Sequence, residues 1–376
     1  MWITGTGALS CAGRNPGELW ESLLAEKSGL IEGLGRVADL SPDAPADLAL
    51  SMALETARQA MGQAGWSHLN EDDGIIIATT TGQILMWDQA LLHFFKDQAD
   101  PESFRRAFAH QPLGQLLNTL TESLGSRTPH RWLLTSACTA STQALIMGAL
   151  WIRQKKVKRC LVGSVEVLCD LTVQGFRSLQ LLSNETARPF DRDRKGINLS
   201  EGAAFVCLEG QNPGPRALAE VRGWGLTTDA FSMTSPEAEG RGSYRAMKQA
   251  LETAKLAPNE IDWIHAHGTG SMHNDAAEGQ AVRALFGAKS PPLTSTKAIH
   301  GHLLAASGLL ETVIGVEALK RQTVLGTANV QNIDETTGAN VLVKSEPRPL
   351  RHIMKNTLGF GGANAALVLS RVGDRA

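Results

Sequence analysis

The sequence predicts an α/β protein made of two related halves. Short apolar runs typical of buried strands alternate with segments whose apolar residues recur at helical spacing, and this alternation favours an α/β fold. Residues 210–215, GQNPGP, can continue neither a strand nor a helix, and after them the order of elements starts again. We therefore expect an N-terminal half over residues 1–212 and a C-terminal half over residues 213–376.

In the N-terminal half, each element is predicted from a local pattern. Residues 2–5 predict a short buried strand, and residues 17–27 and 46–64 have the apolar spacing of helices. Residues 73–78 form an apolar run typical of a buried strand. Residues 133–134 lead through Thr-Ser into a run of small residues that predicts a helix packed on all sides. Residues 160–163 predict another buried strand.

The C-terminal half repeats this order. Residues 217–221 parallel the opening strand, and residues 263–267 parallel residues 75–79. Residues 293–295, Leu-Thr-Ser, parallel residues 134–136, and residues 356–362 parallel the region of Gly163. The pattern indicates a duplicated α/β unit. The pair Gly5 and Gly7 after the opening strand does not continue as a dinucleotide-binding loop, and we interpret it as chance.

Composition and charge exclude several classes of protein. There are 36 Lys and Arg against 38 Asp and Glu, a formal net charge of −2, which argues against a nucleic-acid-binding protein. No stretch approaches the ~20 apolar residues that a membrane-spanning helix needs. The N-terminus lacks the charged and apolar regions of a signal peptide. Five cysteines, an odd number without framework spacing, predict a reduced protein in the cytoplasm.

Cys138 is the candidate nucleophile. It lies in the segment TSACTAS, between a predicted strand and a predicted helix. The positive end of a helix dipole favours a thiolate, so we expect an exposed, activated sulfur with backbone N–H groups nearby. The alternative is a buried core cysteine, which is what we expect of Cys160 and Cys207.

His267 and His302 are the candidate acid–base residues. His267 ends a predicted strand and opens HGTGS, while His302 ends STKAIHGH. A neutral imidazole can donate or accept a proton near pH 7, and two such loops can converge on one sulfur. Two structural alternatives stay open. Both histidines can be satisfied structural residues, or the pairs His265/His267 and His300/His302 can chelate zinc, because residues i and i+2 of a strand share a side.

A glycine-rich turn, residues 359–364, lies between two apolar runs. It can present a backbone N–H to a developing oxyanion, or it can be a plain hairpin turn.

Together these segments resemble the elongating β-ketoacyl-acyl-carrier-protein synthases of the thiolase superfamily. The resemblance runs in order through TSACTAS, RPFDRDRKGINLSEGAA, HGTGSMHNDAAEGQAV, STKAIHGHLLAASG and LGFGGANAALVLS. It implies a thiolase fold, with two pseudo-repeated halves in five layers, α-β-α-β-α. It also implies a dimer, either a homodimer or a heterodimer with a related ketosynthase subunit. Thiolases use a second cysteine in the C-terminal half, where this chain has none after Cys207, and chain-initiating synthases replace the second histidine by Asn.

The resemblance implies a decarboxylative Claisen condensation in fatty-acid or type II polyketide-like synthesis. Cys138 would take an acyl chain from an acyl carrier protein, and His267 and His302 would bind the thioester carbonyl of malonyl carrier protein. No permanently bound cofactor and no metal are implied, because phosphopantetheine arrives on the carrier protein. Two alternatives remain: a chain-length-factor-like partner subunit and a Cys–His acyl hydrolase.

Supporting roles follow from the same resemblance. Lys297, with Glu278 as its partner, would orient the histidines. Thr269 and Ser271 would hold the phosphopantetheine arm. Phe360 would gate the acyl pocket, and its N–H, with that of Cys138, would form the oxyanion hole.

A docking surface for the carrier protein is expected at the pocket entrance. Carrier proteins of this kind are acidic, so the rim should be locally basic. Arg192, Arg194 and Lys195 follow the segment RPFD and are the candidates.

Overall fold

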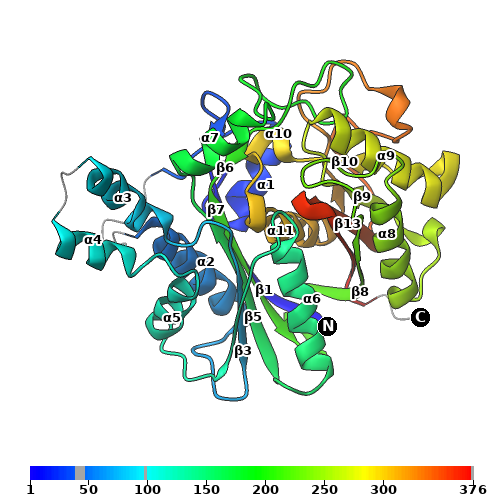
Figure 1. Cartoon of the computed structure of the whole chain (residues 1–376). Coiled ribbons are helices and arrows are strands. Elements are labelled where there is room, and N and C mark those ends of the chain that lie inside the picture. Colours follow the sequence, from blue (N-terminus) through cyan, green and yellow to red (C-terminus); the bar gives the residue numbers. More distant parts are fainter. Residues whose placement is uncertain (39–46, 97–99, 374–376) are drawn as a thin grey trace.

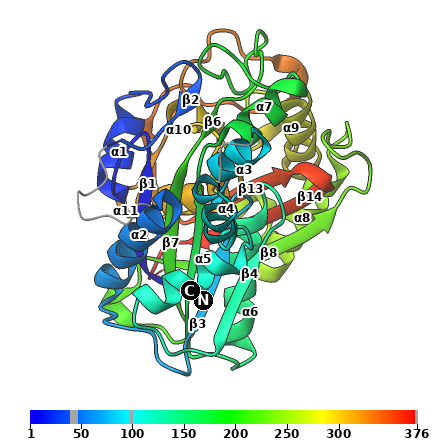
Figure 2. The ribbon, with the colours of Figure 1, turned by 60° about the vertical axis from the view of Figure 1, so that its left-hand side comes forward.

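The computed structural model describes residues 1–38, 47–96 and 100–373. Its main sheet has the strand order β10-β9-β13-β14-β8-β1-β7-β5-β3-β4. Strands β1 and β8 meet in the middle, where Trp2 pairs with Glu220 and Ile3 with Ala219. The strands on the two sides of this junction come from opposite halves of the chain, as the colours in Figures 1 and 2 show.

The two halves repeat one strand arrangement, as the restarted element order predicted. In each half the second strand is antiparallel to both neighbours, and the last two strands are parallel to the third. From the junction outwards, the N-terminal strands are β1 (Trp2–Ser10), β7 (Gly202–Glu209), β5 (Arg159–Glu166), β3 (Gly74–Ala78) and β4 (His130–Leu134). Their C-terminal counterparts are β8 (Ala219–Thr228), β14 (Ala363–Ser370), β13 (His352–Gly359), β9 (Trp263–His265) and β10 (Leu293–Thr294).

Helices complete the five layers of the predicted thiolase fold. Helix α6 (Ala140–Arg153) contacts β3 and β5 on one side and β8 and β14 on the other, and α11 (Ser307–Arg321) contacts β1, β7 and β13. Both helices therefore lie between the halves, which explains their small, buried residues. Helix α2 (Leu48–Ala64) covers the outer face of the N-terminal half. Helices α8 (Arg241–Ala254) and α9 (Met272–Phe286) cover the other outer face.

Shorter elements frame this core. The predicted helix over residues 46–64 begins at Leu48, where the Asp47 side chain accepts from the Ala49 N–H; residue 46 lies outside the described residues. The others are α1 (Pro16–Leu24), α3 (Asp88–Phe95), α4 (Pro101–Phe108), α5 (Gly114–Ser123), α7 (Asp170–Ser178), α10 (Lys297–His300), and the short strands β2 (Leu34–Gly35), β6 (Leu199–Ser200), β11 (Thr323–Val324) and β12 (Glu346–Pro347).

Gly5 and Gly7 have a packing role. A Cβ at Gly5 would lie 2.0 Å from the carbonyl oxygen of Ala60, and one at Gly7 would lie 2.0 Å from that of Thr56. The two glycines let α2 pack directly against β1, which explains the Gly-x-Gly pattern without a nucleotide. Across the described residues, we find no helix with the length and apolar character that crossing a membrane requires.

Candidate active site

Cys138 lies in the turn between β4 and α6. Ala137 before it has a φ of 45°, so the chain turns sharply from the strand into the helix. The cysteine is 5% exposed, and burial raises the pKa of its thiol to about 11. The backbone N–H groups of Phe360 and of Cys138 itself also bond the sulfur, and they lower this pKa. The expectation of an exposed sulfur that favours the thiolate is therefore wrong, because desolvation outweighs the favourable dipoles.

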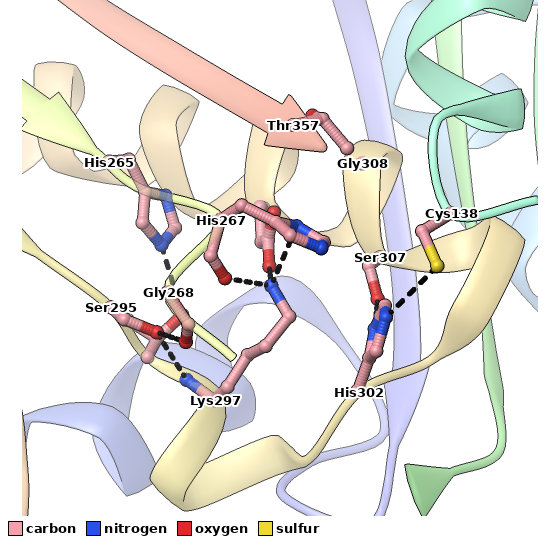
Figure 3. A network of polar contacts seen from close by, with 12 residues as sticks. Cys138, His265, His267, Gly268, Ser295, Lys297, His302, Ser307, Gly308 and Thr357 are labelled. Carbon is pink, nitrogen blue, oxygen red and sulfur yellow. Dashed lines mark hydrogen bonds and ion pairs between the residues drawn. The ribbon is translucent and has the colours of Figure 1, made fainter. Parts of the chain in front are cut away.

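His302 is the direct partner of this thiol. Its Nε2 lies 3.2 Å from Cys138 Sγ, and its Nδ1 lies 2.8 Å from the Oγ of Ser307 at the start of α11; Figure 3 shows both side chains beside the His302 ring. Burial, and then the charge of Lys297, hold the pKa of His302 well below its usual value. Thiol and imidazole are therefore both uncharged at neutral pH.

His267 approaches Cys138 and His302 from the turn after β9. Its ring centroid lies 5.1 Å from that of His302, with the ring planes at 82°. Burial, and then Lys297, keep its pKa well below the usual range. The ligating atoms of Cys138, His267 and His302 all lie within 4.8 Å of one another. The structure therefore brings the three predicted residues together.

Glu278 holds the backbone beneath His267. Its Oε1 accepts from the His267 N–H at 2.7 Å and its Oε2 from the Gly268 N–H at 2.8 Å. Asn356 Nδ2 also donates to Oε1, at 2.7 Å. Burial raises the pKa of Glu278 to about 7. This carboxyl group therefore fixes the turn that presents the imidazole.

Lys297 pairs with Glu311, so the predicted Lys297–Glu278 pair is wrong. Helix α9 places Glu278 below the turn, whereas α11 brings Glu311 to the ammonium group. Lys297 Nζ also donates to the His267 carbonyl at 2.6 Å and lies 3.4 Å from His267 Nδ1. Lys297 thus contacts His267 directly (Figure 3).

Sequence reasoning missed a second buried lysine in this network. Lys355 of β13 lies 2.5 Å from Glu311 Oε2, and its Nζ donates to the Asn356 carbonyl and to Thr357 Oγ1. Burial alone would raise the pKa of Glu311, but Lys297 and Lys355 hold it well below its usual value. The available signal was a lysine directly after Ile353 and Met354, in a segment that leads into the glycine-rich turn, because a buried ammonium group needs a partner.

The fold does not form the two zinc-chelating pairs, His265/His267 and His300/His302, that the sequence left open. His265 Nε2 lies 3.0 Å from Thr296 Oγ1, and the same hydroxyl lies 2.8 Å from His300 Nε2. Strand β9 ends at His265, so strand alternation does not extend to His267. Burial lowers the pKa of His265 to about 3 and that of His300 to about 4. These two histidines form a separate buried cluster at Thr296.

A pocket of about 330 Å³ leads to Cys138, His267 and His302. Thr269 and Ser271 both line it, and the Thr269 hydroxyl donates to Ser271 Oγ at 3.1 Å. Phe360 lines it as well and stacks on Phe176 of α7, with centroids 5.5 Å apart and planes at 17°. The three residues predicted to bind the carrier arm and gate the pocket therefore all line the pocket that contains Cys138.

Arg194 does not belong to the predicted docking rim. It is 4% exposed, and its guanidinium donates to Asp334 Oδ2 at 2.6 Å and to the Asp191 carbonyl at 2.8 Å. Its placement on the rim is therefore wrong, because Asp334 draws the side chain inwards. Lys195 does line the pocket, with its side chain 63% exposed and paired with Glu185 at 2.9 Å. Arg192 is exposed.

Comparisons with known proteins agree with this geometry. Family models described as the N-terminal and C-terminal domains of beta-ketoacyl synthase match residues 36–213 and 218–331. A 3-oxoacyl-[acyl-carrier-protein] synthase 2 of Coxiella burnetii is 31% identical, over 99% of this chain and 98% of its own. Nodulation protein E of Rhizobium meliloti is 30% identical, over 98% of both chains.

Solved structures with the same fold include two ketosynthase assemblies. A chain of the ishigamide ketosynthase/chain length factor has a TM-score of 0.90 and 28% identity, over 99% of both chains. A chain of a ketosynthase in complex with its chain length factor from Xenorhabdus doucetiae has a TM-score of 0.85 and 27% identity, over 99% of this chain and 98% of its own.

Proposed function

Because the chain belongs to the β-ketoacyl synthase family, we propose that it condenses an acyl chain on Cys138 with malonyl carrier protein. The reaction is an acyl transfer with loss of CO2, in fatty-acid or type II polyketide-like synthesis. The observation that carries the proposal is one thiol and two uncharged imidazoles converging at the inner end of a pocket. Such a set can form a thioester and then stabilise an enolate.

In the first half-reaction, Cys138 Sγ attacks the thioester carbonyl of an acyl carrier protein. A thiol with a pKa of about 11 is protonated at neutral pH, so its proton passes to His302 Nε2, 3.2 Å away. The bond from the carbonyl carbon to the phosphopantetheine sulfur breaks, and the departing thiolate takes that proton. The N–H groups of Cys138 and Phe360, which already face the sulfur, stabilise the oxyanion.

In the second half-reaction, malonyl carrier protein loses CO2. The electron pair moves onto the thioester oxygen, where His267 and His302 each donate a hydrogen bond worth about 2.7–4 kcal/mol in the transition state. The enolate carbon then attacks the Cys138 thioester, whose C–S bond breaks. The product is a β-ketoacyl chain two carbons longer. Lys297 holds His267 in place by donating a hydrogen bond to the His267 carbonyl.

Thr269 and Ser271 support the binding of the phosphopantetheine arm, which arrives on the carrier protein. Phe360 gates the acyl pocket from its position against Phe176. Residues 1–212 supply the nucleophile, and residues 213–376 supply the histidines.

The proposed partners are an acyl carrier protein and a second ketosynthase subunit, identical or related. Edge strand β4 offers a surface for that subunit, because Trp132 on it is 51% exposed. A cytoplasmic location, predicted from the cysteine count, stays a prediction.

Intact-mass measurement tests the function. The enzyme is incubated with a panel of acyl carrier proteins, and the matching malonyl carrier protein is then added. We expect one acyl mass on the enzyme, followed by its loss and a β-ketoacyl carrier protein. Free acid as the product would instead establish the Cys–His hydrolase, and an unmodified enzyme that promotes the activity of a related subunit would establish the chain-length factor. Stoichiometric zinc by elemental analysis would establish the metal site.

A further inference from the structure

Ser307 gives His302 a partner that can donate or accept a hydrogen bond. The serine Oγ lies 2.8 Å from His302 Nδ1, and both side chains are buried. On the other side of the ring, Nε2 lies 3.2 Å from Cys138 Sγ. Within the described part of the chain, the Ser307 hydroxyl bonds no group other than this imidazole, so its hydrogen can rotate about the C–O bond.

The proposed condensation needs His302 in two forms. During acylation, Nε2 must accept the thiol proton, so the uncharged ring must carry its hydrogen on Nδ1. During enolate formation, Nε2 must carry the hydrogen and donate it to the thioester oxygen, which leaves Nδ1 as an acceptor. A backbone carbonyl or N–H at Nδ1 would favour one form only, because neither can reverse its role.

We propose that Ser307 is a positioning residue that lets His302 change tautomer between the two half-reactions. This inference rests on the proposed function. Before acylation, the Cys138 S–H donates to Nε2, and Nδ1–H donates to the serine oxygen. After acylation, the serine O–H donates to Nδ1, and Nε2–H faces the pocket. Nε2 takes up a proton from water in the pocket, and the ring then releases its Nδ1 proton to that water when it turns away from Ser307, so the charge is unchanged and nothing is oxidised or reduced.

Counting hydrogen bonds explains why acylation drives the change. With a free thiol, each of the two arrangements makes two hydrogen bonds along the line of Cys138, His302 and Ser307. Acylation removes the S–H donor, so Nε2 of the Nδ1–H form is left without a donor, whereas the Nε2–H of the other form can still donate to an oxygen in the pocket. One hydrogen bond shifts such an equilibrium on the order of tenfold. The low pKa of His302 keeps the doubly protonated ring from competing.

Nitrogen NMR of the histidine-labelled wild-type protein tests the switch directly. Spectra are recorded before and after iodoacetamide alkylates Cys138, since alkylation removes the S–H as acylation does. The His302→Ala variant assigns the signal. We expect alkylation to shift the ratio of the Nε2–H to the Nδ1–H form of His302 about tenfold towards Nε2–H, whereas an unchanged ratio overturns the proposal. Alkylation needs no carrier protein, so failure of the condensation assay and failure of this inference are separate results.

A pair of variants on α11 adds a kinetic test. Ser307→Ala should slow both Cys138 acylation and malonyl decarboxylation about tenfold. Thr312→Val is the matched control, because Thr312 is also buried on this helix but donates to the Gly308 carbonyl and does not touch His302. Unchanged rates in Ser307→Ala overturn the proposal. If that variant does not fold, the nitrogen NMR spectra of the wild-type protein alone test the proposal.

Discussion

Each half of the molecule fixes a turn at the end of a buried parallel strand with a glutamate, but only the turn of the C-terminal half carries a side chain that faces the site. In the N-terminal half, Glu166 accepts from the N–H groups of Thr80 and Thr81, beyond β3. In the C-terminal half, Glu278 accepts from the N–H groups of His267 and Gly268, beyond β9. Burial raises the pKa of both carboxyl groups to about 7.

The side chains on the two turns differ. The hydroxyls of Thr80 and Thr81 also bind Glu166, at 2.8 and 2.6 Å, so they are used to hold their own turn. The ring of His267 makes no bond to Glu278 and instead faces His302. A repeated backbone therefore supplies equivalent sites, and the residue placed on each decides whether it serves structure or chemistry.

The largest effect is expected at the nucleophile of the N-terminal half. Cys138→Ala should abolish the acyl adduct and all condensation, because no other thiol contacts His302 among the described residues. Intact-mass spectrometry with peptide mapping measures it. An adduct that persists on Cys11, Cys160, Cys169 or Cys207 would contradict the assignment.

Next in size are the histidines of the C-terminal half. Replacing either His267 or His302 by Ala should slow malonyl decarboxylation by about 10²–10³-fold, the usual loss for one donor to a developing oxyanion. His267→Ala should leave acylation of Cys138 much less affected, since His267 does not bond the thiol. Release of CO2 and single-turnover acylation are measured separately, and decarboxylation at the wild-type rate in both variants would break the mechanism.

The two glutamates provide a direct test of the comparison. Glu278→Gln should slow decarboxylation about tenfold, because its amide N–H₂ would face a backbone N–H and displace the His267 turn. Glu166→Gln should lower the free energy of unfolding by about 1–3 kcal/mol and have a smaller effect on decarboxylation. Urea unfolding and CO2 release are compared for both. Equal losses of activity would mean that the two turns serve the site alike.

Lys355→Met should move the acid limit of activity upwards. The titratable and charged groups that act on the two imidazoles are Cys138, Lys297, His300, Glu311 and Lys355. After burial and Lys297, the charge of Lys355 also lowers the pKa of His267 and of His302. Without Lys355, the remaining Lys297–Glu311 pair has no net charge, so the pKa values of both histidines rise. As the pH falls, the histidines are then protonated sooner, and activity is lost at a less acidic pH.

The shift is towards higher pH, because removing a nearby positive charge makes each imidazole easier to protonate. The pH profile of decarboxylation measures it. Met354→Leu, on the opposite face of β13, is the control that alters packing without charge. A profile that stays in place in folded Lys355→Met would show that this lysine has a structural role only.

The smallest effect is expected at the pocket rim. Lys195→Glu should raise the KM for carrier protein a few-fold and leave a small phosphopantetheine thioester unaffected, because exposed charges act weakly and are screened by salt. Lys158→Glu is the matched control: Lys158 is 78% exposed and paired with Asp72, and it does not line the pocket. A KM that ignores salt would remove Lys195 from the docking surface.

Local patterns in the sequence were enough to predict the α/β repeat and to make Cys138, His267 and His302 candidates. Strand and helix periodicity are properties of neighbouring residues, so the alternation and its restart after residue 210 could be predicted without coordinates. Cys138, His267 and His302 each lie where a predicted strand or helix meets small residues and turns. Resemblance to a known family then joined these separate segments into one site.

Two of the errors concern the partners of charged groups. Arg194 was predicted at the rim from its neighbours along the chain, but its partner, Asp334, lies 140 residues away. Lys297 was assigned to Glu278, yet Glu311 is the carboxylate that α11 brings to it. An ion pair between distant segments leaves no periodic signal in either segment.

The sequence by itself therefore determined the order of the elements and the duplication, because these depend on residue type and local spacing, and its resemblance to a known family selected the thiol and the two imidazoles. Only the tertiary structure decided that Cys138 is a buried thiol with a pKa of about 11, that Lys355 shares Glu311 with Lys297, and that Ser307 lies against His302. Desolvation and hydrogen-bond partners depend on which segments pack together, and the tertiary structure alone determines which segments meet.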